Sequence, residues 1–490
     1  MLLKRSSFLL LFVGLAGCVV AYASALFVEP GLADPVNTIV PIVLGLLVLY
    51  VGYRNVVHNH LLMWTPLPYF LGACALYFSA GPTLYFFGDK DLIWRVNQTH
   101  PVTSQELLTV NLLNTISILM IMGAYYLALR WYGSYRSIVP RERAARGPAR
   151  IKLAVLLFLG IGLPVKYLII LPYQLGITDT LVAGVVIQLQ YLIPVAIVLL
   201  CILAFRCGGI WHVMFYATVA AELLTSTLTF AKTDVLTTLV MLTLGAFAVY
   251  PRPRTLAAGF LAVLIAYVLL VPLVFYGRSA SGEIEQAGLA ERLEIVRSYL
   301  AAGAPKNDDQ VQVWWERLSY AKHQAFAMGE YDRGRPGDTV VLALYIPIPR
   351  AVWPDKPAIS VGREFYFLMA KTRHALSAPG IFAEAYWNGG WWLVVFVCVY
   401  VGGVFAGFTV YAVRRVALQQ FLFLPVIFFG IKMGFRPDGW FASTYVGDLL
   451  NAVLLHVVLA IVAALIPARI AATRAAGIKE PALENAVARQ

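Results

Sequence analysis

Charge is what this sequence has least of. Only 13% of its 490 residues are Asp, Glu, Lys or Arg, about half the share that is usual in soluble domains. Hydrophobic residues make up 60% of the chain, and the mean hydropathy is +0.74. A chain with so few charges cannot cover a soluble surface of its size, so the composition excludes an ordinary soluble protein and indicates a membrane protein.

Cysteine is also scarce, with five residues in the whole chain. Cys18 follows Leu15-Ala16-Gly17 after a basic N-terminal stretch, as in a lipoprotein signal. The apolar run there is about 20 residues long, which exceeds a usual signal segment, so we expect an uncleaved first span. The other four have no metal or redox spacing and are interpreted as small packing residues in or beside apolar blocks: Cys74, Cys201, Cys207 and Cys398.

Long apolar blocks dominate what is present. A bilayer is crossed by about 20 helical residues, and backbone groups in lipid must find their partners within the segment. Twelve blocks meet this requirement: 7–28, 37–53, 61–87, 104–129, 151–172, 180–205, 210–230, 234–250, 255–276, 391–413, 417–434 and 446–467. The sequence therefore predicts an all-α polytopic membrane protein with about twelve transmembrane helices.

The basic residues predict the orientation of these helices. If twelve spans alternate, 19 of the 38 Lys and Arg residues fall on one side, seven of them between 130 and 152. Positive residues mark the cytoplasmic side of a membrane protein. We therefore expect both termini in the cytoplasm of a bacterial cell, with the chain in its inner membrane. The net charge of +12 is explained by this bias, so no nucleic-acid partner is expected.

One connection differs from the others. Residues 277–390 hold 13 of the 26 acidic residues and lie on the periplasmic side by the same alternation. Apolar spacing predicts amphipathic helices over 289–300 and 314–325, and the aromatic stretch 380–392 is expected to re-enter the membrane. The predicted organisation is nine helices in 1–276, a large periplasmic loop in 277–390, and three helices with a cytoplasmic tail in 391–490.

A proline-rich segment, IPIPRAVWPDKP at 346–357, lies in this loop. Its four prolines fix φ and bias the preceding residues to extended geometry, which predicts a stiff, non-helical platform. Trp353 suits the level of the lipid headgroups. Arg350 and Lys356 are then cations held at the outer membrane surface.

Other cations share that side, although the positive-inside bias disfavours them there. A ligand of dense negative charge explains them, because guanidinium groups match phosphate oxygens well. The alternative is that each one snorkels to the headgroups or pairs with a nearby acid. The predicted pyrophosphate-binding set is Lys232, Arg278, Arg350, Lys356, Arg363 and Arg436.

LYIPIPRAVWPDKP at 344–357, the Gly362-Arg363 step, and GIFAEAYWNGG at 380–390 before another span together resemble the Wzy-type oligosaccharide repeat-unit polymerases. That family includes the O-antigen and enterobacterial common antigen polymerases. FAKTDV at 230–235 resembles the basic turn that these proteins carry before their large loop, and FRPDGW at 435–440 resembles their late arginine segment. The resemblance covers the chain from about residue 229 onward. Lys232 stands where an arginine is common in the family.

The resemblance implies a membrane glycosyltransferase that acts on undecaprenyl-pyrophosphate-linked glycans. A growing glycan would move onto a sugar hydroxyl of another lipid-linked repeat, with inversion, without a metal or other cofactor, and with undecaprenyl pyrophosphate leaving. Preorganised cations stabilise the charge that develops on such a leaving group. The polar loop has no acid pair suited to a divalent ion, because Asp308-Asp309 stands alone. A chain-length regulator protein and membrane lipids are the expected partners.

The base that activates the acceptor hydroxyl has several candidates. Glu384 lies in the aromatic re-entry, where partial burial would raise its pKa toward neutrality, and Asp438 lies two residues from Arg436. His323 and His374 are weaker candidates. Each has a structural alternative: a salt-bridge partner for Glu384, a helix N-cap for Asp438 and surface positions for the histidines.

Two other function classes stay open. A flippase for the same lipid-linked sugar predicts ionisable residues near the bilayer midplane and broken helices in two related halves. The candidates for such charges are Lys166, Glu222 and Asp448, which we expect near helix ends. A ligase that moves finished glycan to another acceptor differs from a polymerase only in the resemblance of the proline segment.

Overall fold

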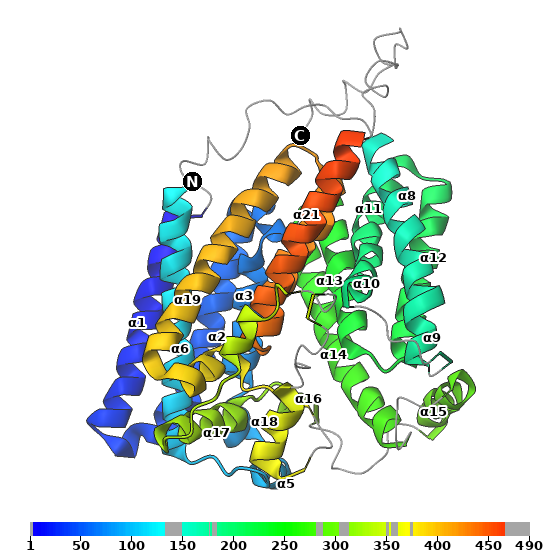
Figure 1. Cartoon of the computed structure of the whole chain (residues 1–490). Coiled ribbons are helices and arrows are strands. Elements are labelled where there is room, and N and C mark those ends of the chain that lie inside the picture. The colour runs from blue at the N-terminus through cyan, green and yellow to red at the C-terminus, as the bar shows by residue number, and fades with distance from the viewer. Residues whose placement is uncertain are drawn as a thin grey trace.

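The computed structural model (Figure 1) describes residues 3–132, 149–175, 177–178, 184–280, 288–302, 313–348, 352–353, 361–372 and 376–465. All regular secondary structure in these ranges is helical, and ten helical segments there are long and apolar enough to cross a membrane. The prediction of an all-α polytopic membrane protein is confirmed.

The ten segments follow the predicted blocks. Five of them are single helices or lie within one: Arg5–Phe27 (α1), Ser104–Trp131 (α6), Lys232–Val249 (α13), Pro253–Val274 (within α14, Pro253–Ala280) and Gly380–Ala417 (α19). A sixth, Pro30–His58, is mostly α2 (Ala33–His58). Pro66–Phe87 joins α3 (Pro66–Cys74), the π-helix η3 (Ala75–Ala80) and α4 (Leu84–Phe87), and Ala149–Gln174 joins α8 (Ala149–Pro164), the π-helix η4 (Val165–Ile170) and α9 (Leu171–Gln174). Val186–Cys207 contains the end of α10 (Gly184–Leu189) and α11 (Leu192–Cys207), and Phe441–Ala464 contains the π-helix η8 (Phe441–Gly447) and most of α21 (Asp448–Leu465).

The remaining two predicted spans also form helices, but one is too polar and the other too short to be counted with these ten. The block at 210–230 becomes α12 (Ile210–Leu228), whose polar residues, Glu222 among them, lower its hydropathy. The block at 417–434 becomes the short 3₁₀ turn η7 (Phe421–Phe423) and the eleven-residue α20 (Leu424–Gly434). At 1.5 Å per residue, α20 covers about half of a bilayer core.

The helices α6 and α19 pack closely against each other. A Cβ atom built on Gly402 would lie 2.6 Å from the carbonyl oxygen of Ile121, so only glycine fits at this point. Tyr125 and Thr409 form a hydrogen bond of 3.1 Å between the same two helices. Small residues and interhelical hydrogen bonds are what hold helices together inside a membrane.

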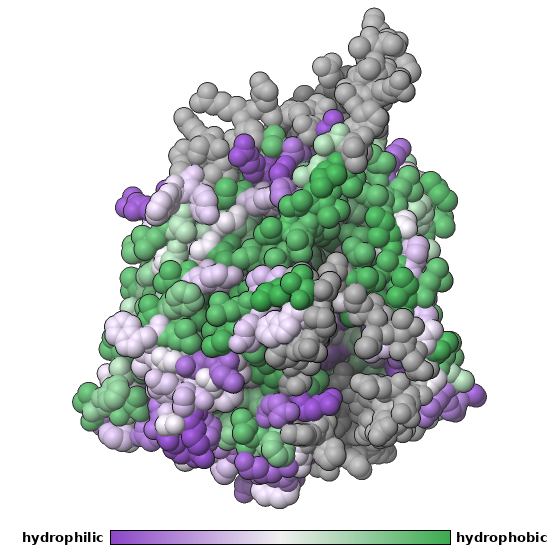
Figure 2. Space-filling model, in the orientation of Figure 1, coloured by the Kyte–Doolittle hydropathy of each residue, from purple (hydrophilic) through white to green (hydrophobic). Residues whose placement is uncertain are grey.

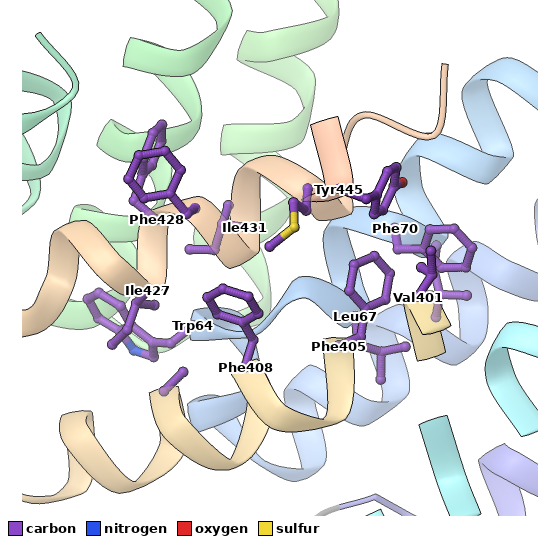
Figure 3. Close-up of a cluster of buried hydrophobic side chains, with 14 of the residues drawn as sticks. Trp64, Leu67, Phe70, Val401, Phe405, Phe408, Ile427, Phe428, Ile431 and Tyr445 are labelled. Atoms are coloured by element: carbon purple, nitrogen blue, oxygen red, sulfur yellow. The ribbon is translucent and has the colours of Figure 1, made fainter. Parts of the chain in front are cut away.

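A buried apolar cluster joins α3, α19 and α20 (Figure 3). The rings of Phe70 and Phe405 meet edge to face with centroids 5.4 Å apart, and Trp64, Phe408 and Phe428 extend the cluster. Close packing of this kind fixes the position of α20 although the helix is short.

A layer of short helices closes one end of the bundle, the lower end in Figure 1. It contains α5 (Lys90–Asn97), α15 (Leu289–Ala302), α16 (Val313–Glu316), α17 (Ala321–Asp332) and α18 (Val361–Ala370). The 3₁₀ helix η6 (Val340–Leu344) instead packs against η8 and α19. The predicted helix over 289–300 corresponds to α15. The predicted helix over 314–325 is instead divided into α16 and α17, with turns between them.

The layer is attached to the bundle by buried polar contacts. The side chains of Asn114 and Gln324 exchange hydrogen bonds of 3.1 and 2.9 Å between α6 and α17, and Trp315 donates one of 2.7 Å to the carbonyl of Ala80. Figure 2 shows a band of hydrophobic surface on the viewed face, with hydrophilic residues gathered toward both ends of the molecule. This distribution suits a bundle that crosses a bilayer.

The predicted re-entry at 380–392 forms the beginning of α19. This helix continues to Ala417 and breaks at Gly389 and Gly390. Gly390 has φ +60°, and a Cβ atom there would lie 2.7 Å from the hydroxyl of Tyr331. The glycine pair therefore lets α19 change direction where it leaves the layer.

Candidate functional site

The turn between α20 and η8 carries two of the predicted site residues, Arg436 and Asp438. Tyr320, which precedes α17, donates a hydrogen bond of 3.0 Å to Oδ2 of Asp438. Arg436 Nε lies 3.8 Å from Oδ1 of Asp438, and the arginine side chain is 38% exposed. The turn also receives a hydrogen bond of 3.1 Å from Ile381 N–H to the carbonyl of Pro437, so it is held against the start of α19.

The electrostatic surroundings keep Arg436 charged. Burial lowers the pKa of its guanidinium, but Asp438 and three tyrosines, Tyr77, Tyr320 and Tyr191, more than offset this and raise the pKa above its ordinary value. Burial and the Asp438 carboxylate raise the pKa of Tyr320 well above its usual range. The Tyr320 hydroxyl therefore keeps its proton and donates it to Asp438 in a hydrogen bond.

A second cation lies one turn earlier. Lys432, in the last turn of α20, contacts Oδ1 of Asp448 over 3.0 Å, and their side chains are 12% and 5% exposed. Its ammonium also lies 4.6 Å from the ring centre of Tyr191, a cation–π contact. We call the group formed by these residues the arginine cluster: Tyr77, Tyr191, Tyr320, Lys432, Arg436, Asp438 and Asp448.

A small hollow lies beside the arginine cluster, between η4, α12, α13 and the residues that precede and begin α11. Its cavity volume is about 10 Å³, which is room for about one water molecule. It is called here the side hollow and is lined by Lys166, Gln190, Tyr191, Pro194, Glu222, Asp234 and Thr237. Lys166 and Glu222 form a buried ion pair of 2.6 Å, and Tyr167 donates a further hydrogen bond of 3.0 Å to the same carboxylate.

This ion pair differs from the sequence-based expectation. Lys166 and Glu222 were expected near helix ends, but Lys166 lies in the π-helix inside the Ala149–Gln174 span and Glu222 inside α12. The two residues are 56 positions apart, and neither lies in a motif. Asp448 is the first residue of α21 and so lies at a helix end as expected, although η8 precedes it in the same apolar span.

Glu384, one of the two predicted catalytic residues, is fully buried near the start of α19. Its Oε1 accepts a hydrogen bond of 2.8 Å from the Thr339 hydroxyl, and its Oε2 accepts one of 2.6 Å from the Phe441 N–H. Asn388 donates to Thr339 over 3.0 Å and accepts from Val340 N–H over the same distance. In this structure Glu384 joins η6 and η8 to α19, and its role as a base stays a prediction.

The other predicted cations come from several elements. Lys232 begins α13, and its ammonium lies 5.6 Å from the ring centre of Tyr267. Arg363 is exposed on α18. Arg278 lies in α14, but its side chain is outside the described residues, as are Arg350 and Lys356 entirely. Pyrophosphate binding by these last three residues therefore stays a prediction.

The other candidates for the base lie in different surroundings. His323 is buried, and burial together with nearby cations lowers its pKa to about 3, so it stays neutral at ordinary pH. His374 lies outside the described residues. Asp438 does not cap the last helix, since η8 begins after Trp440 without a side-chain cap.

In the part of the chain that the structure describes, no group of three His, Cys, Asp or Glu residues could hold a metal ion.

Comparisons with models of protein families, with curated proteins and with solved structures found no match. What the fold establishes is the class: an all-α polytopic membrane protein, with the arginine cluster near its layer of short helices.

Proposed function

We propose that this protein is a membrane glycosyltransferase that polymerises undecaprenyl-pyrophosphate-linked oligosaccharide repeat units. One observation carries the proposal: Arg436 is surrounded by tyrosines and Asp438, keeps its charge, and is still 38% exposed. A guanidinium that is surrounded by protein groups, and is still partly exposed, is suited to bind a pyrophosphate that arrives from the membrane. The resemblance of 344–390 and 435–440 to the Wzy-type polymerases supports the same chemistry.

The arginine cluster can stabilise the departure of the lipid carrier. During transfer the acceptor hydroxyl oxygen bonds to the anomeric carbon of the donor glycan while the bond from that carbon to pyrophosphate breaks. The electron pair stays on the pyrophosphate, where negative charge grows. A preorganised charge contact contributes up to about 3–4 kcal/mol to the transition state in a water-excluded site, and the partial exposure of Arg436 makes its share smaller.

The proposed setting is the periplasmic face of a bacterial inner membrane, with both termini in the cytoplasm. The argument is the distribution of Lys and Arg: the connections that carry 19 of the 38 basic residues belong to one side. The layer of short helices, which the arginine cluster adjoins, then faces the periplasm. A chain-length regulator is the proposed protein partner.

Purified protein incubated with a synthetic lipid-linked repeat unit tests the proposal. A ladder of products indicates a polymerase, a single transfer to another lipid indicates a ligase, and no covalent product contradicts both. Arg436→Gln is expected to abolish the ladder, and Arg436→Lys to retain only part of it because the fork of donors is lost. Arg54→Gln is the matched control, since Arg54 is partly exposed and donates a hydrogen bond to Tyr50.

Arg350 is tested in the same assay. Both Arg350→Ala and Arg350→Lys should lose most turnover at matched protein levels if its guanidinium geometry matters to the leaving pyrophosphate. An Arg350→Ala protein with the wild-type rate would remove that residue from the site.

A second candidate function is transport of the same lipid-linked sugar. The observation that favours it is the pair Lys166–Glu222, which is buried among the helices with Asp234 near it. Buried charges and interrupted helices such as η4 and η8 are typical of transporters. Movement of a fluorescent lipid-linked sugar across proteoliposomes, without any new glycosidic bond, would support this function instead.

A further inference from the structure

The helix α15 lies at the lower right corner of the molecule in Figure 1, and a buried arginine attaches it there. The guanidinium of Arg292 donates hydrogen bonds of 3.1 Å to the carbonyl of Gln174 and of 3.5 Å to the carbonyl of Leu228. These are the last residues of α9 and α12, where backbone carbonyls have no partner within their own helix. The arginine therefore holds α15 at the level at which two helices of the bundle end.

Apolar contacts attach the same face of α15 to the end of α14. Ile295 is buried in a small cluster with Phe230 and Val274, and the hydroxyl groups of Ser298 and Tyr276 form a hydrogen bond of 3.3 Å. Val274 is the last residue of the apolar Pro253–Val274 span. This face of α15 therefore packs on the bundle where a membrane-crossing segment ends.

A second face of α15 is apolar and exposed. Leu289, Leu293 and Leu300 are 45%, 48% and 73% exposed. They are spaced by four and seven residues, so they lie on one side of the helix, and together they are called the leucine stripe. Apolar surface of this kind on a helix that is already attached to its protein marks a contact with something outside the chain.

The charged residues of α15 occupy the remaining side of the helix. Successive residues turn by about 100°, so the buried face is followed around the helix by the leucine stripe and then by Arg297, Glu294 and Glu291. Glu294 and Arg297 are exposed and lie 3.8 Å apart. At this corner Figure 2 shows hydrophilic surface on the lower, outer side and hydrophobic surface above it. A helix that lies on a membrane surface has such an arrangement of apolar and charged sides.

The surface next to the leucine stripe indicates which partner covers it. Leu261, Ile265 and Leu269 are exposed on α14 within its apolar span, so lipid is the medium that covers them. Since α15 packs on the end of α14, a bilayer around α14 extends to α15. The exposed charges of α15, two Glu and one Arg, give no attraction to anionic headgroups, so apolar insertion is what favours this contact.

We propose that α15 lies in the membrane interface, with Leu289, Leu293 and Leu300 inserted at the boundary between the lipid headgroups and the acyl chains. The helix then holds the beginning of the 277–390 connection at the membrane surface, at the same end of the bundle as the arginine cluster. This contact does not depend on the proposed reaction, so it is expected whether the protein is a polymerase, a ligase or a transporter.

An environment-sensitive fluorophore on α15 tests the proposal in liposomes that contain the whole protein. Cys207→Ser removes the exposed cysteine, and Leu293→Cys then carries the label. Glu294→Cys is the matched control on the charged side, and Leu269→Cys is the reference for contact with lipid. We expect blue-shifted emission at positions 293 and 269, with strong quenching by lipids that carry a nitroxide on the acyl chain near the headgroup. Position 294 should be red-shifted and quenched much less.

Leu300→Cys is measured in the same way, and the proposal requires the result expected for position 293 at this position also. Equally weak quenching at 293, 294 and 300 would overturn the proposal, because the leucine stripe would then face water. Blue-shifted emission that nitroxide lipids do not quench, and that is lost when the protein is diluted with lipid, would also overturn it, since a second copy of the chain would then cover the stripe. Melting temperatures equal to that of the Cys207→Ser protein confirm that the labelled variants are folded.

Discussion

Tyr320 donates a hydrogen bond of 3.0 Å to Asp438 across 118 positions of the chain. The contact ties the layer of short helices to the turn that carries Arg436, so the layer and the arginine cluster form one unit. It also leaves Oδ1 of Asp438 directed at Arg436, 3.8 Å away.

Tyr320→Phe should weaken this unit. The substitution leaves a carboxylate oxygen of Asp438 without its donor, and such a loss typically costs about 1–3 kcal/mol. We expect a lower melting temperature and a drop in elongation of about tenfold or more. Tyr53→Phe, at an exposed tyrosine of α2, should change neither quantity. Equal activity and stability of Tyr320→Phe and wild type would show that the contact has no role.

Glu384→Gln separates a structural role from a catalytic one. The amide of Gln cannot accept from both the Thr339 hydroxyl and the Phe441 N–H, so one buried donor loses its partner at a cost of about 1–3 kcal/mol. We expect a lower melting temperature, and near-normal turnover per folded molecule at low temperature. Thermal unfolding and elongation rates measured on the same preparation check this. Unchanged stability together with abolished turnover would identify Glu384 as the catalytic base.

Gly390→Ala should destabilise the protein. Its φ of +60° disfavours any side chain, and the new Cβ atom would lie 2.7 Å from the Tyr331 hydroxyl. Strained backbone of this kind costs about 1–3 kcal/mol. Gly403→Ala in the same helix has open space around its Cβ position and should be neutral or slightly stabilising. Similar melting temperatures for the two variants would contradict the role given to the glycine break.

The proposed orientation is tested with reporters. Arg335, an exposed residue of the layer of short helices, should support a reporter that is active only in the periplasm. A fusion after Arg252, between α13 and α14, should be inactive with that reporter and active with a cytoplasmic one. Reversed activities would place the arginine cluster on the cytoplasmic side and exclude the proposed reaction there.

Most of the fold could be predicted from apolar length alone, because lipid leaves a long apolar segment no alternative to a helix. Ten of the twelve predicted blocks are helices of spanning length and hydropathy. The two that differ, α12 and α20, are limited by polar content and by length. Local spacing also could not show that the helix expected over 314–325 breaks, since contacts such as Trp315 with Ala80 come from tertiary packing.

The candidate site was predictable only where its residues are close in sequence. The neighbourhood of Arg436 and Asp438 follows from their spacing of two. The donors to Glu384, however, come from Thr339 and Phe441, 45 and 57 positions away, and no periodicity indicates such pairings. The ion pair Lys166–Glu222 was missed for the same reason. A buried charge needs a partner, but sequence alone does not indicate which one.

The central claim is that the arginine cluster binds the pyrophosphate of a lipid carrier. Direct binding of undecaprenyl pyrophosphate to the purified protein, compared for wild type, Arg436→Gln and Arg54→Gln, tests it most directly. A hydrogen bond to a charged group contributes about 1.5–3 kcal/mol, so Arg436→Gln should weaken binding by about tenfold to a hundredfold, while Arg54→Gln binds as the wild type does. Equal affinity of all three proteins would contradict the claim.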